Sequence, residues 1–183
     1  AITGASGSGK STLLNIIGLI DKPDSGEVLI CGNKNPYDKE KIKLNLFRNN
    51  IGYLFQNYAL VDNYTVSKNL DIALEYVKGK NKNKLKEEAL DKVGLLDKLN
   101  NKVFELSGGE QQRVALARLM LKKNDIILAD EPTGSLDEDN KAIILKLLKE
   151  LNNEGKTVVI VTHDKVVADI CDREINIKEL NCK

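Results

Sequence analysis

Tryptophan is absent from this 183-residue sequence, and cysteine, proline and aromatic residues are scarce. The three cysteines, Cys31, Cys171 and Cys182, are odd in number, lie far apart and match no zinc or redox spacing. Small secreted domains that depend on disulfides carry many closely spaced cysteines. We therefore exclude a disulfide framework, and we expect reduced thiols in a cytosolic compartment.

Long apolar runs and an excess of either charge are absent as well. The longest apolar stretch, residues 13–20, contains Asn15 and Gly18 and falls short of the ~20 residues that span a bilayer. Lysine and arginine number 28 and aspartate and glutamate 27, for a net charge of +1. This balance offers no broad surface for nucleic acid or anionic lipid, so no nucleic-acid partner is expected. The sequence predicts a soluble protein, and no signal peptide is visible.

Short β-branched runs alternate with helical segments along the chain. The runs are AIT before Gly4, IGYLF before Gln56, DIILA before Asp130 and TVVIV before Thr162. Continuous apolar runs of this kind are typical of buried parallel strands in a covered sheet. Helices are predicted over residues 10–17, 38–48, 109–121 and 136–151, the last with a possible capping box from Ser135 and Glu138. The predicted fold class is α/β.

The stretch between Tyr58 and Asn124 is more charged and more helical than the rest. Its Lys/Asn-rich patch KGKNKNKLKEE, residues 78–88, indicates a solvated turn and a helix start. We interpret this stretch as a helical lobe inserted into a single domain.

A glycine-rich loop follows the first run. GASGSGKS, residues 4–11, satisfies G-x-x-x-x-G-K-[ST] between a predicted strand and a predicted helix, as phosphate binding requires. Its N–H groups would face phosphates, Lys10 would reach the β/γ oxygens and Ser11 would offer its hydroxyl to Mg²⁺. The alternative is a merely flexible Gly/Ser turn, although a chance match is rare at an average glycine content of about 7%.

Polar side chains follow three other runs. Asp130 and Glu131 lie where open α/β sheets place their ligands. Acidic residues often end strands, but beside a phosphate loop one carboxylate can hold Mg²⁺ while its neighbour polarises the attacking water. His163, the only histidine, could donate to the γ-phosphate, and Gln56 has a similar placement. Either residue could be structural instead.

The segment LSGGEQQR, residues 106–113, begins another predicted helix. Ser107 and Glu110 have the spacing of an ordinary capping box. That spacing does not explain Gly108 and Gly109, because glycine costs about 1 kcal/mol relative to alanine in a helix interior. Bare N–H groups at this positive helix end would make a second anion site.

Together these residues resemble the ATP-binding subunit of ABC transporters. Six motifs come in that family's order: the phosphate loop, Gln56, LSGGEQQR, ILADEP, GSLD (residues 134–137) and VTHD (residues 161–164). The resemblance covers nearly the whole chain. It implies a P-loop NTPase (RecA-like) fold, with a mostly parallel sheet flanked by helices, an all-helical lobe and an incomplete N-terminal antiparallel β part. It also implies one domain over residues 1–183, with an α/β core at 1–58 and 120–183 and the lobe that carries LSGGEQQR at 59–119.

The resemblance also implies MgATP hydrolysis between two cassettes that pair head to tail. Glu131 would be the general base, His163 and Lys10 would act on the γ-phosphate, and Gln56 would bind Mg²⁺ or water and sense a transmembrane partner. The implied nucleotide-binding set is Gly4, Ser6, Gly7, Ser8, Gly9, Lys10, Ser11, Thr12, Gln56, Asp130, Glu131 and His163. The second cassette would add Ser107, Gly108, Gly109 and Asp137 in trans, and the metal set is Ser11, Gln56 and Asp130. Replacing Ser107 or Gly109 is then expected to spare ATP binding by the monomer and abolish turnover.

Residues 15–28 and 54–70 are similar to cassettes of the lipoprotein-release and macrolide-export type and of antimicrobial-peptide exporters. This similarity implies an export subunit at the cytoplasmic face of the cell membrane, with permease subunits as partners. Residues beyond the Gln56 loop could form an apolar groove for a coupling helix or belong to the core: Tyr58, Leu60, Val61 and Tyr64. The alternative is a soluble or regulatory ABC-type ATPase that is not engaged in transport.

The chain departs from the family pattern at its start. Family members usually carry an adenine-stacking aromatic residue and further β-strands before the phosphate loop. This sequence has no initiator Met and begins too late to contain them, so we expect an N-terminal truncation. Since base–aromatic stacking is worth about 1–3 kcal/mol, ATP binding is expected to be about ten- to a hundredfold weaker than in an extended version.

Overall fold

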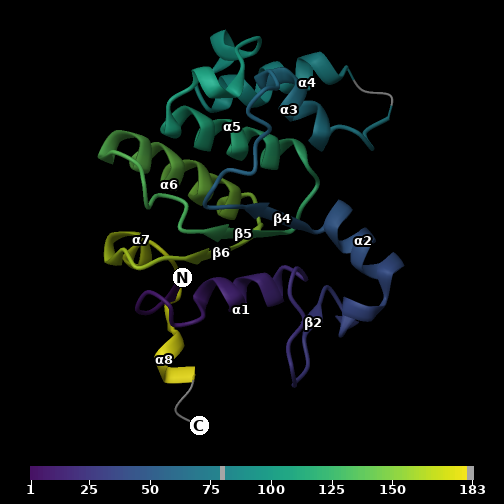
Figure 1. The fold of residues 1–183 in the computed structure, drawn as a ribbon, viewed down its shortest axis with the longest axis vertical. Helices are drawn as coiled ribbons and strands as arrows, with labels where there is room; N and C mark the ends of the chain where they lie inside the picture. Colours follow the sequence, from purple (N-terminus) through teal and green to yellow (C-terminus); the bar gives the residue numbers. More distant parts are fainter. Residues whose placement is uncertain (79–80, 181–183) are drawn as a thin grey trace.

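The computed structural model describes residues 1–78 and 81–180. Its strands are β1 (Ile2–Thr3), β4 (Ile51–Leu54), β5 (Ile126–Asp130), β6 (Thr157–Val161) and β7 (Ile175–Asn176). They form one parallel sheet in the order β4-β5-β6-β1-β7 (Figure 1). The four predicted runs supply four of these five strands, and the α/β class is confirmed.

Three helices carry the sequence motifs: α1 (Lys10–Ile17), α5 (Gly108–Leu121) and α6 (Glu138–Asn153). The bounds of α1 and α5 agree with the predicted bounds to within one residue. Helix α2 (Glu40–Asn49) begins two residues later than predicted, because Pro36–Asp38 forms a separate 3₁₀ turn. The other helices are α3 (Val66–Ala73), α4 (Lys82–Lys92), α7 (Lys165–Asp169) and α8 (Ile177–Leu180), and further 3₁₀ turns lie at Leu96–Lys98 and Val103–Glu105.

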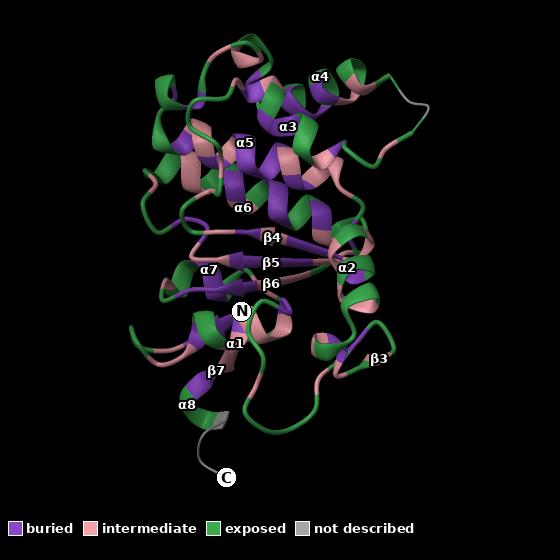
Figure 2. Cartoon of the chain, turned by 45° about the vertical axis from the view of Figure 1, so that its right-hand side comes forward, coloured by how far each residue is buried: buried purple, intermediate pink, exposed green. Residues whose placement is uncertain are grey.

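Strand β5 is buried on both faces of the sheet. Ile127 and Ala129 pack into a cluster with α5 and α6, while Leu128 packs on the opposite face with α1. All three side chains are fully buried. Successive side chains of a strand point to opposite faces, so a sheet covered on both sides requires a continuous apolar run. Figure 2 shows this layering, with the buried strands between α5 and α6 on one side and α1 on the other.

The start of α6 corrects one prediction. Its cap is Asp137, whose carboxylate accepts a hydrogen bond from the backbone N of Asn140 at 2.8 Å. Ser135 Oγ lies instead 3.3 Å from Tyr58 Oη. The capping box predicted from Ser135 and Glu138 is therefore wrong, because a carboxylate two residues further along satisfies the free N–H groups of the first turn.

Helices α3, α4 and α5 pack together at one end of the molecule, at the top of Figure 1. Helix α5 also packs on β4 and α6, so it joins this helical region to the sheet. The division into a core and a lobe at residues 59–119 remains a prediction. Within the patch predicted to be solvated, Lys86 is buried and donates from Nζ to Ser67 Oγ at 2.8 Å and to Asp71 Oδ1 at 3.0 Å. Residues 79 and 80 of that patch lie outside the described residues.

A small antiparallel pair is formed by β2 (Leu29–Ile30) and β3 (Asn33–Lys34), in agreement with the expected short antiparallel part. Cys31 is exposed and Cys171 is half-buried, both as free thiols, and Cys182 lies beyond the described ranges. Across residues 1–78 and 81–180, none of the helices has the length and apolar character needed to cross a membrane.

Candidate functional site

The loop between β1 and α1 turns around an open space. Gly4, Gly7 and Gly9 have φ angles of 152°, 74° and 92°, which residues with a side chain rarely adopt. A Cβ added at Gly7 would meet no atom within 4 Å, whereas one at Gly4 would lie 2.9 Å from Ser8 Oγ. The loop therefore forms a backbone cradle. It leads into the N-terminus of α1, where free N–H groups and the helix dipole favour an anion.

Lys10 places a positive charge inside this cradle. The residue is only 7% exposed, and its Nζ donates to the carbonyl oxygens of Gly4 and Ala5, both at 2.9 Å. Ser8 Oγ is buried in the same loop and has no hydrogen-bond partner among the described residues. Because buried polar atoms in proteins nearly always have a partner, this hydroxyl has an unmet hydrogen-bonding capacity within the loop.

Ser11 and Asp130 bring hydroxyl and carboxylate oxygens together beside the loop. Ser11 Oγ donates to Asp130 Oδ1 at 3.0 Å. Partial burial raises the pKa of Asp130 and the charge of Glu131 adds to this effect, against the Ser11 hydrogen bond and the charge of Lys10. Oxygen donors of this kind suit Mg²⁺, which usually takes only one or two carboxylates from a protein. Within the described part of the chain, no group of three or more His, Cys, Asp or Glu side chains could hold a metal ion.

Glu131 and His163 meet where β5 and β6 end. The backbone of Glu131 has a φ of 45°, a strained value for a residue with a side chain. Its N–H donates to the carbonyl oxygen of Val161 at 2.9 Å, which joins the two strand ends. Glu131 Oε1 lies 2.7 Å from His163 Nδ1. The Glu131 side chain is 15% exposed and that of His163 is 68% exposed, so the pair has a shielded carboxylate and an accessible imidazole.

One cavity of about 510 Å³ collects these groups. Its walls are Ser6, Gly7, Lys10, Ser11, Gln56, Glu131, Gly134 and His163. All of them except Gly134 were predicted as site residues from the sequence. Four other predicted residues belong to the same loop and the first turn of α1: Gly4, Ser8, Gly9 and Thr12.

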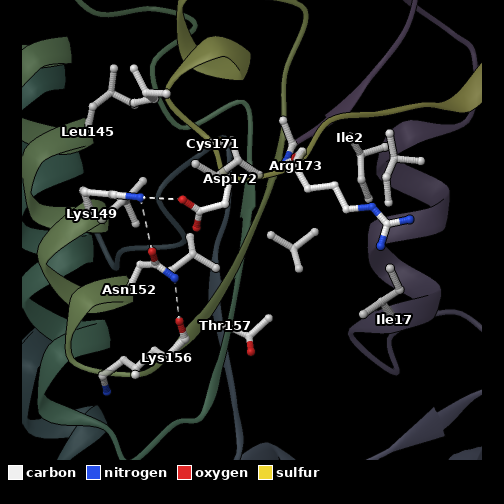
Figure 3. A pocket seen from close by; sticks show the side chains of 18 residues that line it. Ile2, Ile17, Leu145, Lys149, Asn152, Lys156, Thr157, Cys171, Asp172 and Arg173 are labelled. Atoms are coloured by element: carbon white, nitrogen blue, oxygen red, sulfur yellow. Dashed lines mark hydrogen bonds and ion pairs between the residues drawn. The ribbon is translucent and has the colours of Figure 1, made fainter.

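A second cavity, of about 560 Å³, lies where β6, β7 and α6 come together (Figure 3). Its walls are largely apolar and include Ile2, Leu148 and Ile160, with Lys149 and Asp172 joined by an ion pair of 2.9 Å. The loop glycines, Glu131 and His163 do not belong to these walls. The chemistry of the lining, and not its volume, therefore identifies the first cavity as the candidate site.

The LSGGEQQR segment forms the predicted capping box. Ser107 Oγ accepts from the backbone N of Glu110 at 3.3 Å, and the Glu110 carboxylate accepts from the backbone N of Ser107 at 2.8 Å. Ser107 and Gly108 are exposed at the N-terminus of α5, and neither belongs to the cavity walls. Asp137 is exposed at the N-terminus of α6, also away from those walls.

Gly109 has a packing role that the sequence did not reveal. It is buried, and a Cβ added there would lie 2.5 Å from Cγ of Asn140. The Asn140 amide is itself held in place, because its Nδ2 donates to Asp137 Oδ1 at 2.9 Å and Oδ2 at 2.8 Å. Asn140 thus connects the segment GSLD with LSGGEQQR inside one chain. The packing role of Gly109 depends on Asn140, which lies 31 positions further along the chain. No local sequence pattern indicates this contact.

The fold and the site together define a P-loop nucleotide-binding protein. A glycine cradle with a buried lysine opens a helix at the carboxyl edge of a parallel sheet, and carboxylates lie at the end of β5, two strands away from β1. The chain belongs to the ABC transporter family, whose family model, described as "ABC transporter", matches residues 1–134. It is an ATP-binding cassette of this family of ATP-hydrolysing proteins.

Curated relatives agree with this assignment. The macrolide export ATP-binding/permease protein MacB of Shewanella sp. (strain W3-18-1) is 44% identical over 98% of this chain, which spans 28% of that protein. The protein of the same name from Haemophilus ducreyi is 45% identical over 98% of this chain, which spans 26% of that protein. The chain therefore spans only about a quarter of the length of these relatives.

Solved structures share the fold. The ATP-binding cassette MJ0796, in a dimeric post-hydrolysis state bound to ADP and Pi, is 42% identical with a TM-score of 0.87, over 96% of this chain and 78% of that one. CbiO1 from Clostridium perfringens, part of the ABC transporter complex cbiONQ, is 29% identical with a TM-score of 0.83. That match covers 100% of this chain and 78% of the other.

Proposed function

We propose that this chain is the ATP-hydrolysing cassette of an exporter and acts as a head-to-tail pair with a second cassette. The observation that carries the proposal is the contact of Glu131 with His163 at 2.7 Å in the cavity that Lys10 and Ser11 also line. These four side chains place a base, a hydrogen-bonding imidazole, a cation and a hydroxyl around one space.

The residues present fit ATP and Mg²⁺. The open loop, the buried Lys10 and the unpartnered hydroxyl of Ser8 suit a triphosphate chain. Ser11, Asp130 and Gln56 would supply three oxygen ligands for the metal. When bound, Mg²⁺ neutralises charge on the β- and γ-phosphate oxygens.

Glu131 is the proposed general base. Its shielded carboxylate would accept the proton of a water molecule whose oxygen attacks the γ-phosphorus, while the bond to the β–γ bridging oxygen breaks and ADP leaves. His163 would donate from Nδ1–H to the Glu131 carboxylate, and with the imidazole protonated on both nitrogens its Nε2–H would donate to a γ-phosphate oxygen. Lys10 would stabilise the same charge from the loop. The hydrogen bond from the Glu131 N–H to the Val161 carbonyl fixes the backbone of the proposed base against the end of β6.

The exposed N-terminus of α5 is proposed to serve the cavity of a second cassette. Ser107 and Gly108 present a helix N-terminus to solvent, outside the cavity of their own chain. Such a terminus favours a phosphate. MJ0796, which is similar to this chain, is described as dimeric in two structures. We propose that Ser107, Gly108 and Gly109 complete the partner's γ-phosphate site, and that Asp137 links the two sites.

An exposed apolar surface is proposed as the contact for a membrane permease. Of the four residues predicted to form a groove, Val61 and Tyr64 are 41% and 36% exposed, whereas Tyr58 and Leu60 pack partly against the core. Phe104 is 56% exposed, and its N–H donates to the carbonyl oxygen of Asp62, which follows Val61 in the chain. Phe104 therefore lies near the exposed residues Val61 and Tyr64. We place the chain at the cytoplasmic face of the membrane, where nucleotide binding and permease contact are both possible.

The similarity to MacB proteins supports an export role, and the cargo would be chosen by the permease. A soluble or regulatory ABC-type ATPase is the alternative function. Co-purification of the full-length protein with its membrane partner, followed by ATPase assays with lipoproteins, peptides and macrolides, separates the two. Stimulation by one cargo class supports export, whereas a full-length protein with neither a permease segment of its own nor a membrane partner favours the alternative.

Replacing Glu131 with glutamine tests the chemistry. General bases contribute about 10²–10⁴-fold, so Glu131→Gln in the full-length protein should lower MgATP turnover by that factor while ATP still binds and the cassettes still pair. Turnover is measured by phosphate release and binding by a fluorescent nucleotide. Glu87→Gln, an exposed position on α4, is the matched control and should turn over normally. Normal turnover in Glu131→Gln would rule out Glu131 as the base.

A further inference from the structure

We infer that Lys141, in the first turn of α6, is a positioning residue that holds His163 against Glu131. The inference rests on the proposed hydrolytic function and adds a residue that no sequence motif includes. Lys141 does not line the cavity and would not touch the nucleotide. It acts through Asp164, the neighbour of His163.

The contact between Lys141 and Asp164 is an ion pair with a hydrogen bond from Nζ to Oδ2. Both partners are shielded from water, with side-chain exposures of 13% and 29%. A second carboxylate, that of Glu138, lies 3.8 Å from the same Nζ. Shielding strengthens a pair relative to a fully solvated one. The pair therefore fastens the loop after β6 to the start of α6.

Asp164 is fixed on its other sides as well. Its Oδ1 accepts from the backbone N of Val166 at 2.8 Å, and its own N–H donates to Thr162 Oγ1 at 3.0 Å. Thr162 is fully buried. His163 thus lies between one buried neighbour and one anchored neighbour. Its imidazole is 68% exposed, so backbone anchoring is needed to keep Nδ1 at 2.7 Å from Glu131.

The same helical turn also contacts LSGGEQQR. Asn140, next to Lys141, packs against Gly109 and binds Asp137. The first turn of α6 therefore touches both the loop that holds His163 and the helix proposed to serve the second cassette. Asn140 makes these contacts with its own side chain, so replacing Lys141 tests the anchor of the His163 loop without removing them.

The chain contains a matched ion pair for comparison. Lys149, two turns further along α6, binds Asp172 at 2.9 Å, and both pairs join residues 23 positions apart. This second pair is more exposed, at 44% and 76%, and lies in the wall of the apolar cavity shown in Figure 3. A role in positioning His163 predicts sensitivity at Lys141 and none at Lys149, whereas a general role of α6 ion pairs predicts similar effects.

The test measures MgATP turnover of the full-length protein with its membrane partner. Orienting groups of this kind are typically worth about 10-fold or more, so Lys141→Met should lower kcat about tenfold with little change in KM. Lys141→Arg should retain most of the activity, because it keeps the charge. Lys149→Met should match the unmodified protein. Wild-type kcat in Lys141→Met, or an equal loss in Lys149→Met, overturns the inference.

Two further measurements separate positioning from folding and from the proposed function. Asp164→Asn keeps the cap on Val166 but removes the ion pair, so the double variant with Lys141→Met should be no slower than either single variant. The ¹³C-labelled imidazole signal of His163, assigned by its loss in His163→Gln, should show a more mobile ring in Lys141→Met. An unchanged ring overturns the inference. Absence of hydrolysis in the unmodified protein would overturn only the proposed function, because the ring signal still reports on Lys141.

Discussion

At the scale of single residues, Gly109 shows that one position can be constrained for two reasons. It belongs to the segment proposed to reach a second cassette, and it also leaves room for Asn140, whose Cγ would lie 2.5 Å from an added Cβ. Gly108 has more space, since a Cβ there would be 3.3 Å from the hydroxyl end of Tyr58. The two neighbouring glycines are therefore expected to respond differently to the same substitution.

Gly109→Ala should destabilise the fold, whereas Gly108→Ala should not. Overpacking against the held Asn140 amide is expected to cost about 1–3 kcal/mol of unfolding free energy. Alanine at Gly108 should change it by less than about 1 kcal/mol, because alanine is the better helix former. Urea unfolding measures the free energy of unfolding of both variants. Equal midpoints for the two variants would contradict the packing role, and partial recovery in Gly109→Ala with Asn140→Ala would support it.

At the scale of elements, carboxylates cap two helices, Asp137 at the start of α6 and Asp164 at the start of α7. The backbone and side-chain hydrogen bonds from Asn140 hold the pKa of Asp137 below its usual value. The hydrogen bond from Lys141, above all, does the same for the pKa of Asp164. A carboxylate whose pKa is lower in the folded chain stabilises the fold above its unfolded pKa, and that contribution is lost as the pH falls through the folded pKa.

Acidification below about pH 4, the ordinary range of aspartate, should therefore weaken both helix starts. Asp164→Asn should lower stability at neutral pH and should also make the unfolding midpoint less dependent on pH in that acid range. Urea midpoints between neutrality and pH 3 measure this. Parallel pH curves for Asp164→Asn and the unmodified protein would show that Asp164 is not responsible. Asp172→Asn, at the exposed pair with Lys149, is the matched control and should lower the neutral midpoint by less than Asp164→Asn does.

Much of this element-scale picture could be predicted from the sequence. The helix α1 follows from the glycine loop before it, and strand β5 from an apolar run that a doubly covered sheet requires. The loop residues, Glu131 and His163 could be named because polar residues after parallel strands converge at one sheet edge. The roles of Asn140 and Lys141 could not be predicted, because they depend on Gly109 and Asp164, which lie far away in the sequence.

At the scale of the whole molecule, head-to-tail pairing predicts that defective cassettes rescue one another. Lys10→Ala damages the phosphate loop, and Ser107→Arg damages the helix end that would serve the partner. Each variant alone should be inactive, but a mixed pair contains one intact composite site. Random pairing at equal amounts should restore about a quarter of the original sites, as expected for a two-fold assembly. No recovery of turnover on mixing would indicate that both motifs serve the same chain.

The position of β1 within the sheet has a consequence for biosynthesis. This strand comes first along the chain but lies between β6 and β7, pairing Ile2 with Val161 and Ile175. During synthesis from the N-terminus, the phosphate loop therefore emerges long before the strands that hold it in place. A ribosome-bound chain that has reached α5 already has the LSGGEQQR helix but neither β6 nor β7, the two strands that flank β1 in the sheet. Nucleotide binding is thus expected only after β6 and β7 have been synthesised.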